Sequence, residues 1–178
     1  MASARTSVSI FMSRELDADQ VLLVERNPAL RFMGGYHAFP GGTLDPEDSA
    51  ITVQNVVVPE GEDPTEFDTF VVAAARELFE ETGVLFAHGG PLPTEDKLSN
   101  YRQQLLDGKI QWSEILSREG LHLDARDFRP LCRISTPPFI PRGYDAWFFL
   151  CELPKEQSVT IWEGELVNGS FRRASDAL

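Results

Sequence analysis

The sequence is poor in positive charge. Its 16 lysine and arginine residues stand against 28 aspartate and glutamate residues, which gives a formal net charge of −12 at pH 7. A protein with this charge repels the phosphate backbone of nucleic acids and concentrates cations around itself. The composition therefore argues against a DNA-binding domain and is compatible with a site that needs a metal ion.

Long apolar runs are also missing. No stretch approaches the roughly 18 apolar residues that a membrane-spanning helix needs, and the first residues lack the apolar core and cleavage site of a secretory signal. With 178 residues, 42% of them hydrophobic, the chain can bury one sizeable core. We therefore expect a single cytoplasmic domain over residues 1–178, with no membrane partner.

Cysteine is scarce as well. The sequence has two cysteines, Cys132 and Cys151, and both stand in apolar segments without the spacing of a zinc site or a redox pair. We predict two buried thiols and no disulfide.

The remaining pattern predicts an irregular alternation of strands and helices. Residues 8–14 and 20–26 are rich in β-forming residues and flank a polar turn, so they predict a hairpin. Helical spacing predicts three helices, at residues 66–83, 94–108 and 111–120. Apolar character predicts two later strands, at residues 128–136 and 144–153. The last strand is apolar on both faces, which is typical of the middle of a covered sheet. This order favours an α/β fold with a mixed sheet between helical layers.

One predicted helical stretch, "AARELFEETGV" at residues 74–84, concentrates carboxylates. Glu77, Glu80 and Glu81 are three and four positions apart or adjacent, so their side chains converge on the helix surface and repel one another. Their place in the last turn adds an unfavourable interaction with the helix dipole. Water together with Arg76 is one compensation, and it would make the cluster an ordinary solvated helix face.

A divalent cation would compensate this repulsion more completely. Carboxylate oxygens from one helix face suit Mg²⁺ or Mn²⁺, which keep several water ligands and take further oxygens from the phosphates of a substrate. We therefore interpret the three glutamates as a site for Mg²⁺ or Mn²⁺ that acts on a phosphate compound.

The stretch "RELFEETGV" resembles the core of the Nudix box, and "FPGGTLDPED" resembles its upstream half, with Gly42 at the box glycine. The resemblance to the Nudix hydrolase superfamily implies an α/β/α sandwich with a mixed β-sheet. It also implies a metal-dependent pyrophosphohydrolase that cleaves the diphosphate of a nucleoside diphosphate-linked small molecule. A Nudix-fold module that binds nucleotides or regulates without turnover is the alternative.

The resemblance assigns roles to individual residues. Metal ligation falls to Glu77, Glu80, Glu81 and a backbone carbonyl near Gly42. Arg76 would orient the glutamates, because a planar guanidinium offers several donors at once. Glu77 and Glu81 are counted as catalytic, and Glu77 is one candidate for the general base.

A second candidate base comes from the segment near the end of the chain. Glu165 stands six positions before Phe171, which is the spacing that the family shows between a glutamate and a tryptophan. Glu163 is the fallback. For either residue, a place on an exposed loop is an equally good interpretation.

Two departures from the box pattern indicate a branch of the family. Asp48 stands where the box has glutamate, and the gap before Arg76 is about 20 residues longer than the family spacing. The pattern resembles the peroxisomal-type coenzyme A diphosphatases, with an insertion at 49–70 inside the box and a helical insertion at 94–120. Coenzyme A or an acyl-CoA is the substrate that this branch implies. We expect residues 49–70 to form a mobile or partner-facing loop, with an active-site lid as the alternative.

Four further residues are candidates for substrate binding: Arg142, Asp145, Tyr36 and Arg31. Arg142 and Asp145 stand at the start of an apolar strand, where they can hold a phosphate or take part in an ordinary ion pair. Tyr36 can stack on a base or pack in the core.

The assembly and the end of the chain complete the expectations. Homodimers formed through a sheet edge are common in the family, so a homodimer is one expected assembly. The last residues, "ASDAL", read as the first turn of a helix. We therefore expect a C-terminal helix that is cut short.

Overall fold

The structure is a computed structural model, and it describes residues 5–15, 19–31, 33–137 and 143–176. Strands in the described residues are β1 (Arg5–Ser13), β2 (Gln20–Arg26), β3 (His37–Ala38), β4 (Val53–Gln54), β5 (Leu123–Asp124), β6 (Arg129–Ser135), β7 (Tyr144–Glu152) and β8 (Leu166–Arg173). Helices are α1 (Pro64–Thr82), α2 (Glu95–Leu106) and α3 (Trp112–Glu119), with short 3₁₀ turns at η1 (Pro46–Ala50), η2 (Ala125–Asp127) and η3 (Ala174–Asp176).

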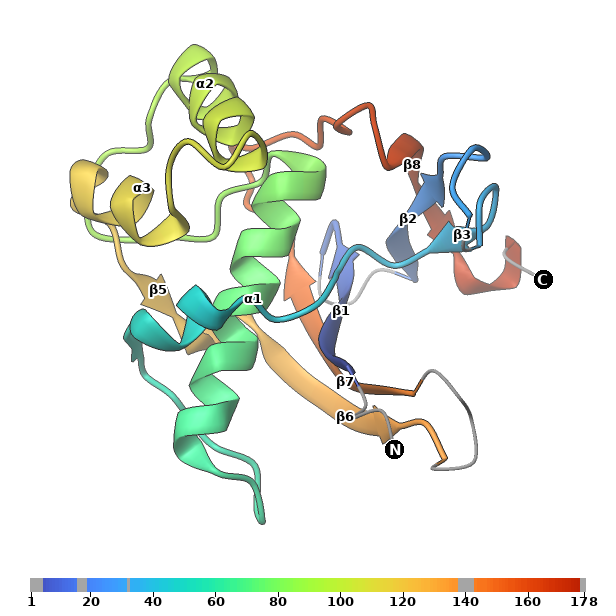
Figure 1. The fold of residues 1–178 in the computed structure, drawn as a ribbon, viewed down its shortest axis with the longest axis horizontal. Coiled ribbons are helices and arrows are strands. Elements are labelled where there is room, and N and C mark those ends of the chain that lie inside the picture. Colours follow the sequence, from blue (N-terminus) through green and yellow to red (C-terminus); the bar gives the residue numbers. More distant parts are fainter. Residues whose placement is uncertain (1–4, 16–18, 32, 138–142, 177–178) are drawn as a thin grey trace.

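A mixed sheet forms the centre of the fold (Figure 1). Its strand order among the described residues is β3-β2-β1-β7-β6, and β8 also pairs with β2. Strands β1 and β7 are parallel over their full length, whereas the other pairs in this sheet are antiparallel. Strands β1 and β2 meet at Ser13 and Val21, which confirms the predicted hairpin, and the mixed sheet is also confirmed.

Helix α1 covers one face of this sheet (Figure 1). It begins after Asp63, whose side chain accepts hydrogen bonds from the first free amides, and it ends at Gly83 in the left-handed conformation, with φ at 73°. The predicted end of the helix is thereby confirmed. The Phe67 ring lies 5.4 Å from the Trp147 ring of β7. Trp147, Phe149 and Cys151 are buried on this face, as the alternation predicted, while Phe148 and Leu150 are half-buried on the other.

Residues 49–70 form the loop that we expected only in part, over residues 55–63, which lie between β4 and α1. Residues 64–70 are the first turns of α1, and Phe67 and Phe70 are buried in the core. Val53 of β4 pairs with Leu123 of β5 in a small parallel sheet. The two ends of the segment are fixed because their apolar side chains are buried in the core. The many acidic residues at 60–68 made the sequence of this segment look like an exposed loop.

Helices α2 and α3 were both predicted, and they lie together beside the carboxyl-terminal half of α1 (Figure 1). The Trp112 ring of α3 lies 5.2 Å from the Phe79 ring of α1, which joins this layer to the core. None of the helices in the described ranges has the length and apolar character needed to cross a membrane.

One prediction about the thiols was wrong. Cys151 is buried in β7, but Cys132 is exposed, because β6 lies at the edge of the sheet. The chain ends its described part in the short turn η3, so the expected C-terminal helix falls outside the described residues and stays a prediction.

Candidate active site

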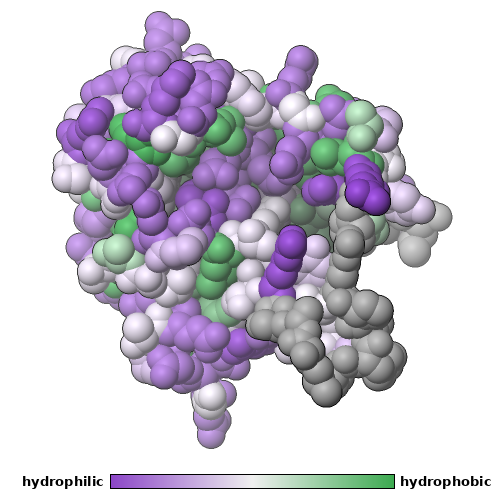
Figure 2. Space-filling view, viewed as in Figure 1, coloured by the Kyte–Doolittle hydropathy of each residue, from purple (hydrophilic) through white to green (hydrophobic). Residues whose placement is uncertain are grey.

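A cavity of about 700 Å³ opens beside the carboxyl-terminal half of α1. Its walls come from α1, the glycine-containing segment 38–43, strands β1, β2 and β7, and the chain just before β8. Figure 2 shows a hollow with a mainly hydrophilic surface between the part of the molecule that carries α2 and the part that carries β2 and β8. Glu77, Glu80 and Glu81 all line this cavity.

The segment after Phe39 fits tightly between β1 and α1. Its Pro40 and Gly42 carbonyls accept hydrogen bonds from the Ile10 and Val8 amides, at 2.8 and 2.9 Å. Gly41 has a φ of 144°, and a Cβ on it would clash with the Val8 carbonyl. A Cβ on Gly42 would lie 2.5 Å from Cδ of Glu77. Only glycine at both positions lets the backbone approach the carboxylates this closely.

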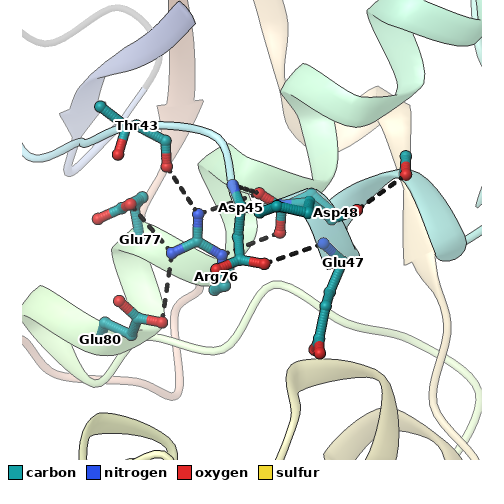
Figure 3. A network of polar contacts seen from close by, with 9 residues as sticks. Thr43, Asp45, Glu47, Asp48, Arg76, Glu77 and Glu80 are labelled. Carbon is teal, nitrogen blue, oxygen red and sulfur yellow. Dashed lines mark hydrogen bonds and ion pairs between the residues drawn. The ribbon is translucent and has the colours of Figure 1, made fainter. Parts of the chain in front are cut away.

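Arg76 joins the two halves of the sequence motif (Figure 3). Its Nε and Nη2 donate to Oδ1 and Oδ2 of Asp48 at 2.9 and 3.0 Å, and Nη2 also donates to the Thr43 carbonyl at 3.0 Å. Asp48 is 1% exposed. The aspartate that departs from the family pattern is therefore a buried partner of the arginine, a role that sequence reasoning missed.

The same guanidinium reaches two of the three glutamates. Its Nη1 donates to Glu77 at 3.0 Å and to Glu80 at 3.3 Å (Figure 3). Burial lowers the pKa of Arg76, but its hydrogen bonds to Asp48 and the surrounding carboxylates more than offset this and leave the pKa above its ordinary value. Arg76 therefore stays charged and fixes the side chains of Glu77 and Glu80 relative to the glycine segment.

The glutamates are destabilised as anions. Burial raises the pKa of Glu77 to about 7, against the lowering effect of Arg76. Burial and the neighbouring charge of Glu77 raise the pKa of Glu81 to about 8, although Glu81 accepts a hydrogen bond from the Gly41 amide at 3.0 Å. Burial also raises the pKa of Glu80. Raised pKa values of this kind are typical of functional sites, where buried carboxylates lie close to one another and a bound cation would compensate their charge.

Glu165 lies in the same cavity as these carboxylates. Its charge contributes to the raised pKa of Glu81, so the two side chains are close. The chain around Glu165 is fixed by Asn27, whose amide donates to the Glu165 carbonyl at 2.7 Å and whose side chain donates to the Gly164 carbonyl at 2.7 Å. Glu163, the fallback, is exposed like Glu165 but does not line the cavity.

Arg26 is a cavity residue that the sequence analysis did not select. It ends β2, lines the cavity, and its charge lowers the pKa of Glu81. Its Nε is buried and has no hydrogen-bond partner within the described ranges. The sequence signal that could have pointed to Arg26 was its position at the end of a predicted strand, shortly before the glycine segment. A half-buried guanidinium with a buried, free Nε–H is suited to an anionic oxygen of a ligand.

The other predicted substrate residues lie elsewhere. Arg142 falls outside the described residues. Tyr36 is 62% exposed, Arg31 is exposed, and neither lines the cavity. Asp145 accepts from Nε and Nη2 of Arg133 at 3.0 and 2.6 Å and is likewise absent from the cavity wall. Successive strand residues point to opposite faces, so Asp145 faces away from Tyr144 and Ala146, which do line it.

The donor set fits a divalent cation, although the side chains are not yet arranged around one. Across the residues that the structure describes, no three histidine, cysteine, aspartate or glutamate side chains converge on a common point. Glu77 and Glu80 turn toward Arg76, and Glu81 turns toward the Gly41 amide. All three carboxylates nevertheless line one cavity and supply the hard oxygen ligands that Mg²⁺ and Mn²⁺ prefer. Rotation of these side chains would be needed to bind the ion.

Comparison with known proteins identifies the family. Residues 4–107, more than half of the chain, match the NUDIX domain. The chain belongs to the Nudix family. Nudix proteins typically use a divalent metal and act on nucleoside diphosphate-linked compounds.

Two similar Nudix proteins can be compared with this chain. A Caenorhabditis elegans protein assigned as nudix hydrolase 7 is 33% identical over 89 residues, which are 50% of this chain and 25% of that protein. The match thus spans a quarter of that relative's length. The crystal structure of a NUDIX hydrolase from Alicyclobacillus acidocaldarius superimposes with a TM-score of 0.81 at 29% identity, covering 99% of this chain and 82% of that one. This likeness confirms the predicted α/β Nudix fold.

Proposed function

We propose that this Nudix protein is a metal-dependent pyrophosphohydrolase that cleaves the diphosphate linkage of a nucleoside diphosphate-linked compound. The observation that carries the proposal is the gathering of Glu77, Glu80 and Glu81 in one cavity, where burial raises the pKa of all three. A binding module without turnover would have no use for three acidic groups held at this cost.

Each part of the site has a role in this reaction. A divalent ion held by Glu77, Glu80 and Glu81, with a backbone carbonyl near Gly42, would neutralise the phosphate oxygens and bring a water molecule in line. Arg76, anchored by Asp48, keeps Glu77 and Glu80 in place.

Arg26 would bind a non-bridging phosphate oxygen through its free Nε–H.

Two carboxylates compete for the role of general base. Glu165 reaches the cavity from the chain before β8 and so approaches from a different side than α1 does. Glu77 is bonded to Arg76, which would have to release it before it could take a proton. This difference favours Glu165 as the base, with Glu77 as a ligand.

Coenzyme A or an acyl-CoA is the proposed substrate. The support is the resemblance of residues 49–70 and 94–120 to the corresponding segments of the coenzyme A diphosphatase branch. In the sequence, Arg31, Tyr36 and Arg142 each stand two positions from a residue that lines the cavity. They therefore stay candidates for contacts with the distant parts of a large substrate.

A substrate panel tests the proposal. Coenzyme A, ADP-ribose, NADH and a dinucleoside polyphosphate are incubated with the protein and Mg²⁺, and phosphate-containing products are measured. We expect turnover of at least one compound, lost by more than 100-fold in Glu81→Gln and retained in Glu156→Gln, which changes an exposed glutamate outside the cavity. Binding without products would favour the module without turnover, and equal activity of wild type and Glu81→Gln would remove the catalytic role assigned to Glu81.

A further inference from the structure

An aromatic residue lines the acidic cavity on the side of α2. Trp162 is half-buried there, and the same cavity is lined by Leu106, the last residue of α2, with 40% of its surface exposed. The other tryptophans, Trp112 and Trp147, are buried in the core at 3% and 5% exposure. The cavity therefore combines a carboxylate floor with an apolar wall.

The backbone before β8 is fixed against the end of α1. The Thr160 amide donates to the Thr82 carbonyl at 2.8 Å, and the Trp162 amide donates to the Glu81 carbonyl at 3.3 Å. These bonds satisfy carbonyls that the last turn of a helix leaves without partners. They also join the backbone of Trp162 to that of Glu81, which supplies one of the proposed metal ligands.

Arg102 of α2 supports the indole from behind. It is 3% exposed, its Nε donates to the Glu80 carbonyl at 2.8 Å, and its Nη1 donates to the Thr160 carbonyl at 2.6 Å. Its Cζ lies 5.2 Å from the centre of the Trp162 ring, within the range of a cation–π contact. The backbone that carries Trp162 is thus fixed to the end of α1 and to Arg102, and the indole itself contacts the buried guanidinium.

We infer that Trp162, in contact with Arg102 and in the same cavity as Leu106, binds a planar aromatic ring of the substrate, such as a purine base, by stacking. The inference rests on the proposed function, because the diphosphate attached to that ring must lie at the glutamates. Stacking needs a rigid aromatic surface close to the phosphate site, and the Trp162–Glu81 backbone bond provides that proximity.

The test compares two non-hydrolysable probes in the presence of Mg²⁺. The α,β-methylene analogue of ADP carries a purine, whereas methylenediphosphonate carries the same phosphorus–carbon–phosphorus unit without a ring. We expect the wild type to bind the analogue about tenfold more tightly, which is the usual gain from stacking one base on an aromatic side chain. Trp162→Ala should lose this difference and keep its affinity for methylenediphosphonate. Trp162→Phe, which keeps an aromatic face, should retain most of the preference.

Fluorescence gives an independent reading. Trp162 is the tryptophan at the cavity, so the purine probe should quench emission in the wild type but not in Trp162→Phe. Equal affinities of the wild type for the two probes, or an equal loss for both probes in Trp162→Ala, would overturn the ring site while leaving the metal–diphosphate proposal standing. A wild type that binds neither probe with Mg²⁺ would overturn the proposed function, and the ring site with it.

Discussion

Asp48 and Arg76 are 28 positions apart in the sequence and form a buried ion pair with two hydrogen bonds, at 2.9 and 3.0 Å. The pair brings η1 against α1 and leaves Nη1 of Arg76 to hold Glu77 and Glu80. The long segment between the two halves of the motif thus does not separate them in space.

Asp48→Asn should destabilise the protein by about 3 kcal/mol, because it leaves the buried arginine without its charged partner. Activity should fall as well, since Glu77 and Glu80 lose their support. Denaturant unfolding and turnover measure the two effects. Asp19→Asn is the control, because it breaks an exposed ion pair with Arg173 and should change stability by less than about 0.5 kcal/mol. A similar loss in both variants would contradict the role of the buried pair.

Gly42→Ala should abolish metal-supported activity, because the new methyl group would meet the Glu77 carboxylate. Gly164→Ala is the matched control beside the same cavity, since a Cβ there would make only an ordinary contact of 3.9 Å with Trp162. Magnesium titration and turnover compare the two. Normal metal affinity in Gly42→Ala would show that the loop does not confine Glu77.

Stability should depend on pH through Glu77 and Glu81. Their folded-state pKa values are raised to about 7 and 8, so between about pH 5 and 8 the folded protein holds more protons than the unfolded chain. Stability without metal therefore falls as pH rises through this window. Thermal unfolding should show a decrease of about 5 °C or more, reduced in the double variant Glu77→Gln, Glu81→Gln.

Magnesium should reverse this trend. A cation binds the ionised carboxylates, so the rise in melting temperature that it causes should be larger at pH 8 than at pH 6. A metal effect that is the same at both values would mean that the ion binds elsewhere.

Arg26→Gln should raise KM by about tenfold or more with little loss of stability, because the Nε of Arg26 has no partner in the described part of the chain. Arg31→Gln is the informative comparison, since the sequence pointed to Arg31 whereas the structure places Arg26 in the cavity. Steady-state kinetics of both variants decides between them. A larger KM effect at Arg31 would favour the assignment made from the sequence.

Features set by local sequence could be predicted. The end of α1 at Gly83, the β1–β2 hairpin and the alternation along β7 follow from residue spacing and turn chemistry. The position of Glu77, Glu80 and Glu81 on one side of the helix follows from helical geometry alone, and all three line one cavity, although their carboxylates do not meet at a common point in the described residues.

Features set by contacts between distant segments could not be predicted. Arg26 belongs to the cavity because β2 ends beside the glycine segment, and Asp48 is buried because η1 packs on α1. Tyr36 is an aromatic residue of the kind that often lines a pocket, yet its side chain is exposed to solvent. Residues 49–70 carry many charges, but Val53 and Phe67 within this segment are buried in the core through contacts that composition does not reveal.

The central claim is that the carboxylates of α1 hold a divalent ion together with a diphosphate. Calorimetric titration of Mg²⁺ into the protein at pH 8, with methylenediphosphonate present, tests it most directly. The account predicts uptake of at least one ion per chain, weakened by more than tenfold in Glu81→Gln and unchanged in Glu156→Gln. No uptake by the wild type, or equal uptake by Glu81→Gln, would contradict it.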